Sequence, residues 1–215
     1  MEGLVKLMEV ALFNTERTAE LLIEEEANDS LGMTPLLKAA TLGLLSAVKD
    51  PLAAGMDANF RYGTDELSLL DVAALMGHLE VMRALLEHGV DVSDANAGGY
   101  TPLLHPVQYG REDLLADVID LLLSAGADIN APTARDFTPL HLVSYRQHSE
   151  EITATLLQRG AAKDAVMRNG RSPLHTAAQV GNLGATRAAS RRRGRHPPPR
   201  RYLLELSAAG RRCPL

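Results

Sequence analysis

The stretch TPLLKAA, residues 34–40, decides the fold, because similar stretches return along the chain. The copies are SLLDVAA at 68–74, TPLLHPV at 101–107, TPLHLVS at 138–144 and SPLHTAA at 172–178. Their first residues are 34, 33, 37 and 34 positions apart. A nearly constant period of this size indicates stacked copies of one structural unit rather than a globular domain around one central core.

The repeated stretch resembles the T-P-L-H-x-A-A signature of the ankyrin repeat, whose usual period is about 33 residues. The likeness continues downstream, where most units carry a Gly after the first helix, a Leu-Leu pair and a second Gly, and the clearest copy ends in GADIN at 126–130. It covers residues 3–186. The resemblance implies an all-α solenoid of stacked helix-turn-helix units joined by hairpin-like finger loops, and a non-catalytic role in binding proteins.

The local chemistry of each unit agrees with two short helices. Thr or Ser can accept hydrogen bonds from the unpaired N–H groups of a helix start, and Pro at the first helical position needs no partner for its missing N–H. Pro occupies that position in four units, at Pro35, Pro102, Pro139 and Pro173. Glycines that end a helix favour the left-handed conformation. We expect this at the first-helix ends, Gly43, Gly77, Gly110 and Gly181.

The period also predicts the domain organisation. Residues 3–33 form a degenerate N-terminal capping repeat, and residues 34–186 hold ankyrin repeats starting near 34, 68, 101, 138 and 172. The third of these has 16 positions between Gly110 and Gly126, whereas the second has 12 between Gly77 and Gly89. This difference predicts a longer second helix or a longer loop between the helices.

The last unit departs from the pattern. Residues 187–201 are rich in Arg and Pro and predict a disordered insert, because highly charged, Pro-rich segments bury too little apolar surface to fold. Residues 202–215 include YLLELSAAG, which resembles the remnant of a last second helix followed by a tail. Three interpretations stay open: a retained intron or gene-model error, a wrong-frame end, or a real basic linker.

Composition and charge bound the function. The 215 residues include one cysteine, Cys213, so no disulfide framework is possible within the chain. No apolar run approaches about 18 residues and the N-terminus lacks a basic start, so we expect no membrane span and no secretory signal. We therefore expect a cytoplasmic protein, with the nucleus as a second location.

Charge is distributed unevenly. Residues 1–186 hold 13 Lys or Arg and 26 Asp or Glu, a formal charge of −13, whereas residues 187–215 hold nine Arg and one Glu, a charge of +8. An acidic repeat region disfavours binding of nucleic acid.

Catalytic and metal-binding constellations are weak in this sequence. His141 and His175 occupy the H of T-P-L-H and His105 lies one place later, which predicts a turn-stabilising hydrogen bond rather than a metal ligand. Ser68, Asp71 and His78 could be read as a triad, but the repeat explains all three positions. No glycine-rich nucleotide motif occurs. We expect no enzyme activity, no cofactor, no metal and no small-molecule substrate.

The resemblance implies a partner-binding surface on the concave side, made by finger tips and first helices. Aromatic residues and Arg are enriched in binding hot spots. The candidate partner contacts are Phe60, Arg61, Tyr62, Asn96, Tyr109, Arg135, Tyr145, Arg146 and Arg168.

The alternatives to a general interaction module are a substrate-recognition adaptor of a larger enzyme system and a nuclear regulator that uses the basic tail. The partner is a protein of unknown identity. We expect a monomer, with self-association through an uncapped C-terminal repeat as the alternative.

Overall fold

The computed structural model describes residues 34–146 and 150–191, and the chain divides into two compact bodies between Ala127 and Asp128. We call the described residues 34–127 the N-terminal body and the remaining described residues the C-terminal body. The predicted capping repeat at 3–33 and the predicted remnant at 202–215 lie outside the described residues.

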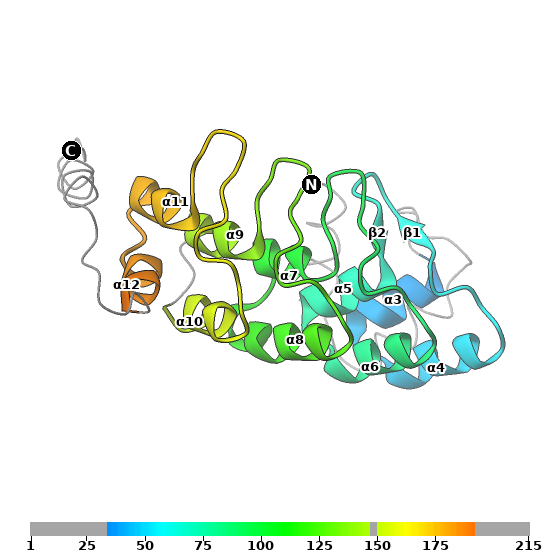
Figure 1. The fold of residues 1–215 in the computed structure, drawn as a ribbon. Coiled ribbons are helices and arrows are strands. Elements are labelled where there is room, and N and C mark those ends of the chain that lie inside the picture. Colours follow the sequence, from blue (N-terminus) through cyan, green and yellow to red (C-terminus); the bar gives the residue numbers. More distant parts are fainter. Residues whose placement is uncertain (1–33, 147–149, 192–215) are drawn as a thin grey trace, which may run out of the picture. The chain divides into compact units, whose positions relative to one another are not determined.

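The N-terminal body is built from pairs of short helices. The first helices are α3 (Pro35–Leu42), α5 (Leu69–Met76) and α7 (Leu104–Tyr109); the second helices are α4 (Leu45–Ala53), α6 (Leu79–Glu87) and α8 (Glu112–Ser124). α5 packs between α3 and α7, and α6 packs between α4 and α8 (Figure 1). First and second helices therefore form two layers, as the predicted all-α repeat fold requires.

The C-terminal body repeats this arrangement. Its first helices are α9 (Pro139–Arg146) and α11 (Pro173–Val180), and its second helices are α10 (Glu150–Gln158) and α12 (Leu183–Arg191). α9 packs on α11 and α10 packs on α12. The disordered insert was predicted to begin at residue 187, but α12 continues to Arg191 because Ala185 and Ala188 are buried. Residues 192–201 lie outside the described part of the chain.

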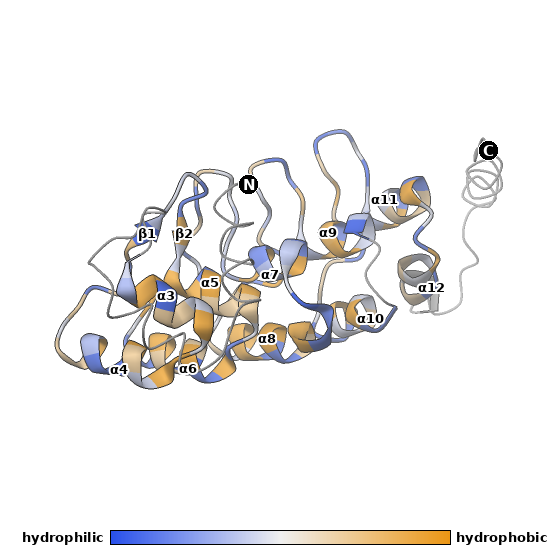
Figure 2. Cartoon of the chain, turned by 180° about the vertical axis from the view of Figure 1, so that it is seen from behind, coloured by the Kyte–Doolittle hydropathy of each residue, from blue (hydrophilic) through white to orange (hydrophobic). Residues whose placement is uncertain are grey.

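Finger loops join one pair of helices to the next. In the first finger, strands β1 (Arg61–Tyr62) and β2 (Leu67–Ser68) pair antiparallel, with Arg61 opposite Ser68 and Tyr62 opposite Leu67. The helices carry most of the apolar residues and the finger loops are more polar (Figure 2). Small residues such as Ala39, Ala73 and Ala177 are fully buried and let neighbouring first helices approach closely.

The helix ends largely follow the local chemistry. The Thr34 and Ser172 hydroxyls accept hydrogen bonds from N–H groups of the first turn, and Gly43, Gly77 and Gly181 end their helices with φ of 75°, 75° and 72°. These glycines confirm the predicted left-handed ends.

Gly110 contradicts the same prediction, because its φ is −74° and its ψ is 175°. Its backbone instead lies over the carbonyl of Pro106, where an added Cβ would approach the carbonyl oxygen to 2.5 Å. The helix before it, α7, begins at Leu104 rather than beside Pro102 and has six residues. Gly is therefore required at this position by a close backbone approach and not by a positive φ.

The extra residues of the third unit lie in a helix. α8 has 13 residues, whereas α4, α6 and α10 have nine each. This confirms the longer second helix, one of the two predicted alternatives. Among the described residues, no helix has the length and apolar character needed to cross a bilayer.

Candidate functional site

Each described finger turns at the same place, two positions before the Thr or Ser that precedes the next first helix. The residues at this turn position are Glu66, Gly99, Asp136 and Gly170, with φ of 51°, 73°, 63° and 75°. Glycine adopts such backbone readily, whereas a residue with a Cβ pays about 1 kcal/mol or more. The two acidic residues are therefore exceptions that need a compensating contact.

Both acidic residues contact the following finger. The Glu66 carboxylate accepts a hydrogen bond from the Ala97 N–H at 3.0 Å. The Asp136 carboxylate pairs with the Arg168 guanidinium at 2.9 Å. A glycine at either position could make neither contact, so these acids link consecutive fingers within each body.

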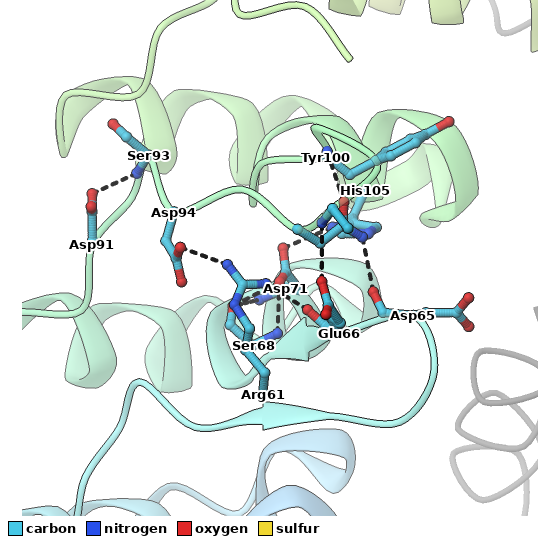
Figure 3. Close-up of polar contacts among 12 residues, drawn as sticks. Arg61, Asp65, Glu66, Ser68, Asp71, Asp91, Ser93, Asp94, Tyr100 and His105 are labelled. Carbon is cyan, nitrogen blue, oxygen red and sulfur yellow. Dashed lines mark hydrogen bonds and ion pairs between the residues drawn. The ribbon is translucent and has the colours of Figure 1, made fainter. Parts of the chain in front are cut away.

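Further contacts hold the two fingers of the N-terminal body together (Figure 3). The Asn96 amide donates to the Asp65 carbonyl oxygen at 2.8 Å. The Arg61 guanidinium donates to the Glu66 carbonyl oxygen at 2.6 Å and pairs with the Asp94 carboxylate at 2.5 Å. Arg61 and Asn96 were both predicted to contact a partner. Their side chains instead bind groups of the two fingers.

The prediction that Tyr62 contacts a partner is contradicted by its burial, since the residue is only 8% exposed. Its hydroxyl oxygen accepts a hydrogen bond from the Thr34 hydroxyl at 3.1 Å, and burial raises its pKa above the usual value. The strand pairs Tyr62 with the buried Leu67, and the tyrosine lines an apolar groove rather than the open surface.

Phe60, by contrast, is 53% exposed and packs edge-on against Tyr62, with ring centroids 4.7 Å apart. Together with Met56, Pro35 and Pro51 it lines an apolar groove of about 560 Å³. Phe60 is therefore exposed beside this groove, and its contact with a partner stays a prediction.

A second cavity, of about 320 Å³, lies between the two fingers of the N-terminal body and α7. We call it the interfinger cavity. Its lining is Thr64, Asp65, Glu66, Asn96, Ala97, Gly98, Tyr100, His105 and Tyr109. The Tyr100 ring stacks on His105 at 5.1 Å and lies 6.5 Å from the Tyr109 ring, with interplanar angles of 29° and 30°.

A buried polar cluster lies beneath this cavity. Asp71, with 0% exposure, accepts hydrogen bonds from the Ser68 hydroxyl and the Ser68 N–H, both at 2.7 Å. Its other oxygen accepts from the His105 Nδ1–H at 2.8 Å, because a carboxylate can only accept. Asp71 thus ties α5 to α7 and fixes the imidazole that supports Tyr100.

Of the three residues that could be read as a triad, His78 makes its contact elsewhere. The His78 Nε2 lies 2.9 Å from the Thr41 carbonyl oxygen, which makes it the donor there. His78 is half-buried, and this burial lowers its pKa. It is a link between α3 and the turn before α6.

The histidines of the T-P-L-H phrase make the predicted hydrogen bonds. The Thr138 hydroxyl lies 2.9 Å from His141 Nδ1, and the Ser172 hydroxyl lies 2.8 Å from His175 Nδ1. The His141 Nε2 also contacts the Arg171 carbonyl oxygen at 3.2 Å, and burial lowers the His141 pKa. Across the described residues, no three His, Cys, Asp or Glu side chains come together as metal ligands would.

The other predicted partner contacts are accessible to different degrees. In the C-terminal body, Tyr145 is 54% exposed and Arg135, Arg146 and Arg168 are exposed. In the N-terminal body, Tyr109 is partly exposed at the interfinger cavity. Whether any of these residues contacts a partner stays a prediction.

Three residues of the cavity lining, Asp65, Glu66 and Tyr100, are not among the contacts predicted from the sequence. A usable signal existed for Glu66, since an acidic residue occupies a turn position where two other fingers have Gly. Tyr100 directly precedes Thr101 of the repeated phrase, at a position that varies between units. Only the packing of its ring on His105 distinguishes it.

The comparison with protein families explains this architecture. A profile described as "Ankyrin repeats (3 copies)" matches residues 39–133 and 115–188, which together span more than half of the chain. The chain belongs to the ankyrin-repeat family. The resemblance inferred from the repeated phrase is therefore confirmed.

Several relatives share parts of this ankyrin-repeat chain. "Ankyrin repeat, SAM and basic leucine zipper domain-containing protein 1" of Dasypus novemcinctus is 30% identical over 149 residues, which are 68% of this chain and 29% of the relative. The "RelA-associated inhibitor" of Mus musculus is 36% identical over 96 residues, 45% of this chain and 11% of the relative.

The "Nuclear factor NF-kappa-B p105 subunit" of Gallus gallus is 30% identical over 158 residues, 71% of this chain and 16% of the relative. The chain thus spans less than a third of the length of each of these relatives. The match concerns their repeats and not their whole-protein activities.

Proposed function

We propose that this ankyrin-repeat protein is a non-catalytic interaction module that binds a protein partner through its finger loops and first helices. The observation that carries the proposal is the contrast between buried and variable positions. The repeated phrase is largely buried, whereas residues that differ between units, such as Phe60, Arg135 and Tyr145, are exposed on the fingers or first helices. Exposed aromatic and Arg side chains are the residue types that contribute most to protein interfaces.

The buried polar cluster supports a non-catalytic role. A nucleophilic Ser must be reachable by substrate and must contact its general base. Ser68 is buried and donates its hydroxyl proton to Asp71, and His105 binds the opposite oxygen of the same carboxylate. The cluster therefore has the chemistry of a structural link between two helices.

The relatives support protein binding in general terms. One is named as an inhibitor associated with RelA and another as a subunit of a nuclear factor, and both names describe proteins that act with other proteins. These names do not identify the partner of this chain. An adaptor role within a larger enzyme system is a special case of the same proposal.

The experiment is an affinity purification from lysate with the full-length chain as bait. The test variants are Phe60→Ser and Tyr145→Ser, which remove exposed rings without touching the buried cluster. The matched control is Arg83→Ala on α6 in the second-helix layer, because the Arg83 side chain is 55% exposed. Circular dichroism first verifies that all variants are folded.

We expect a partner that is retained by the wild type and by Arg83→Ala but lost or weakened by at least one ring variant. Equal recovery by all variants would move the function to the second helices or to the Arg-rich residues 191–201, which is the nuclear-regulator alternative. The proposal also includes a cytoplasmic or nuclear location and a monomeric state. Light scattering of the purified chain would test the latter.

A further inference from the structure

We propose that the interfinger cavity receives a cationic side chain, Arg in first place, from a basic segment of the protein partner. This inference rests on the proposed function and assigns one contact within it. Three features of the cavity support it: the acidic lining, the aromatic wall, and the internal contacts that hold these side chains in place.

The charge of the cavity favours a cation. Asp65 and Glu66 line it, and among its described lining residues none is Lys or Arg. Arg61, whose guanidinium donates to the Glu66 carbonyl oxygen, is itself paired with the Asp94 carboxylate. The described lining therefore carries two acidic side chains and no basic one, which favours a basic side chain over a phosphate or carboxylate.

The formal charge of the N-terminal body also favours a basic partner. Residues 34–127 contain five Lys or Arg and 13 Asp or Glu, a formal charge of −8. Residues 128–191 contain eight Lys or Arg and five Asp or Glu, a charge of +3. The acidity of the repeat region is thus concentrated in the body that holds the cavity, and this body attracts basic segments selectively.

The aromatic wall favours Arg over Lys. The Tyr100 and Tyr109 rings are 6.5 Å apart and inclined by 30°. The planar guanidinium group stacks on aromatic faces and donates hydrogen bonds to carboxylates in its own plane. Figure 3 shows the Tyr100 ring and the Asp65 carboxylate extending toward the same side of the cluster.

Internal contacts hold the walls in place before any partner arrives. The Tyr100 N–H donates to the Asn96 side chain at 3.0 Å, while the Asn96 amide binds the Asp65 carbonyl. His105, against which Tyr100 stacks, is fixed by Asp71. A site whose side chains are already ordered loses little conformational entropy on binding. At about 320 Å³ the cavity lies at the lower end of ligand-site volumes, which suits a single side chain.

The test selects peptides from a random phage-displayed library on the full-length chain. Bound phage are compared with those selected on Asp65→Asn, which removes the charge and keeps the backbone carbonyl that Asn96 uses. The matched control is Asp91→Asn, which makes the same charge change at an exposed site outside the cavity. Selected peptides are then resynthesised with citrulline in place of Arg, since citrulline keeps the shape and removes the charge.

We expect peptides with one recurrent Arg, selected on the wild type and on Asp91→Asn but not on Asp65→Asn. Citrulline replacement, Asp65→Asn and Tyr109→Leu should each raise the dissociation constant about tenfold. Added salt should weaken wild-type binding more than binding to Asp65→Asn. Selected peptides without a recurrent cation, or affinities unchanged by these substitutions, would overturn the assignment.

The failure of this inference is distinguishable from failure of the proposed function. A lysate partner lost with Phe60→Ser or Tyr145→Ser but bound normally by Asp65→Asn and Tyr109→Leu would keep the interaction module and refute the cationic contact. Selection of a peptide that matches the chain's own residues 187–201 would indicate that this segment binds the cavity. That result would contradict the assignment to a partner.

Discussion

Replacement of Asp71 by Ala tests the buried link between α5 and α7. The carboxylate is fully buried and accepts three hydrogen bonds, of 2.7, 2.7 and 2.8 Å, from two groups of Ser68 and from His105. The substitution leaves all three donors without their acceptor. One of these bonds, from the Ser68 N–H, is the Asp71 half of the capping box at the start of α5.

The expected loss follows from the burial of these groups. A hydrogen bond to a buried charged group contributes about 1.5–3 kcal/mol, and a donor left without its acceptor stays desolvated. Three such bonds would sum to about 4.5–9 kcal/mol, but the contributions of groups that share one acceptor are not additive, so the loss is smaller than this sum. We therefore expect Asp71→Ala to lower the free energy of unfolding by about 3–5 kcal/mol.

The assay is urea denaturation followed by the helical circular dichroism signal. Asp71→Asn serves as the control of similar shape, since its amide oxygen can replace one acceptor, and it should cost less than Asp71→Ala. The double variant Asp71→Ala/His105→Ala should be less unstable than the sum of the single variants, with a coupling of about 0.5–3 kcal/mol. A loss below about 1 kcal/mol for Asp71→Ala, or strict additivity, would refute the reasoning.

Two further predictions concern glycine and histidine. Gly181→Ala should cost about 1 kcal/mol of unfolding free energy, because φ is 72° and no atom lies within 4 Å of the added Cβ. Gly77→Ala should cost about 1–3 kcal/mol more, since its Cβ would meet Leu114; equal losses in urea denaturation would contradict this. Burial lowers the pKa of His78 and of His141 below about 6.5, so the unfolded chain binds more protons there. Stability should be fully present above pH of about 6.5 and fall as the pH drops toward the folded-state values, and His78→Asn should reduce this slope in urea titrations between about pH 7 and 5.

Local sequence predicted the helices well, because helix ends depend on near neighbours. Thr34 and Ser172 cap helices through first-turn contacts, and Gly43, Gly77 and Gly181 end helices through their own backbone freedom. The same reasoning failed at Gly110, which follows the six-residue α7 and permits a close approach to the Pro106 carbonyl. Residue spacing alone does not distinguish these two uses of glycine.

The sequence by itself determined the repeat, the two-layer helical unit, the presence of extra residues in the third unit and the membership of the family, because all of these follow from periodicity and short-range hydrogen bonding. Only the tertiary structure decided which residues form the surface. It buried Tyr62, joined Asp71 to a histidine 34 positions away and placed Glu66 against the next finger. Such contacts depend on how one unit stacks on the next, and no pattern within a single unit encodes that geometry.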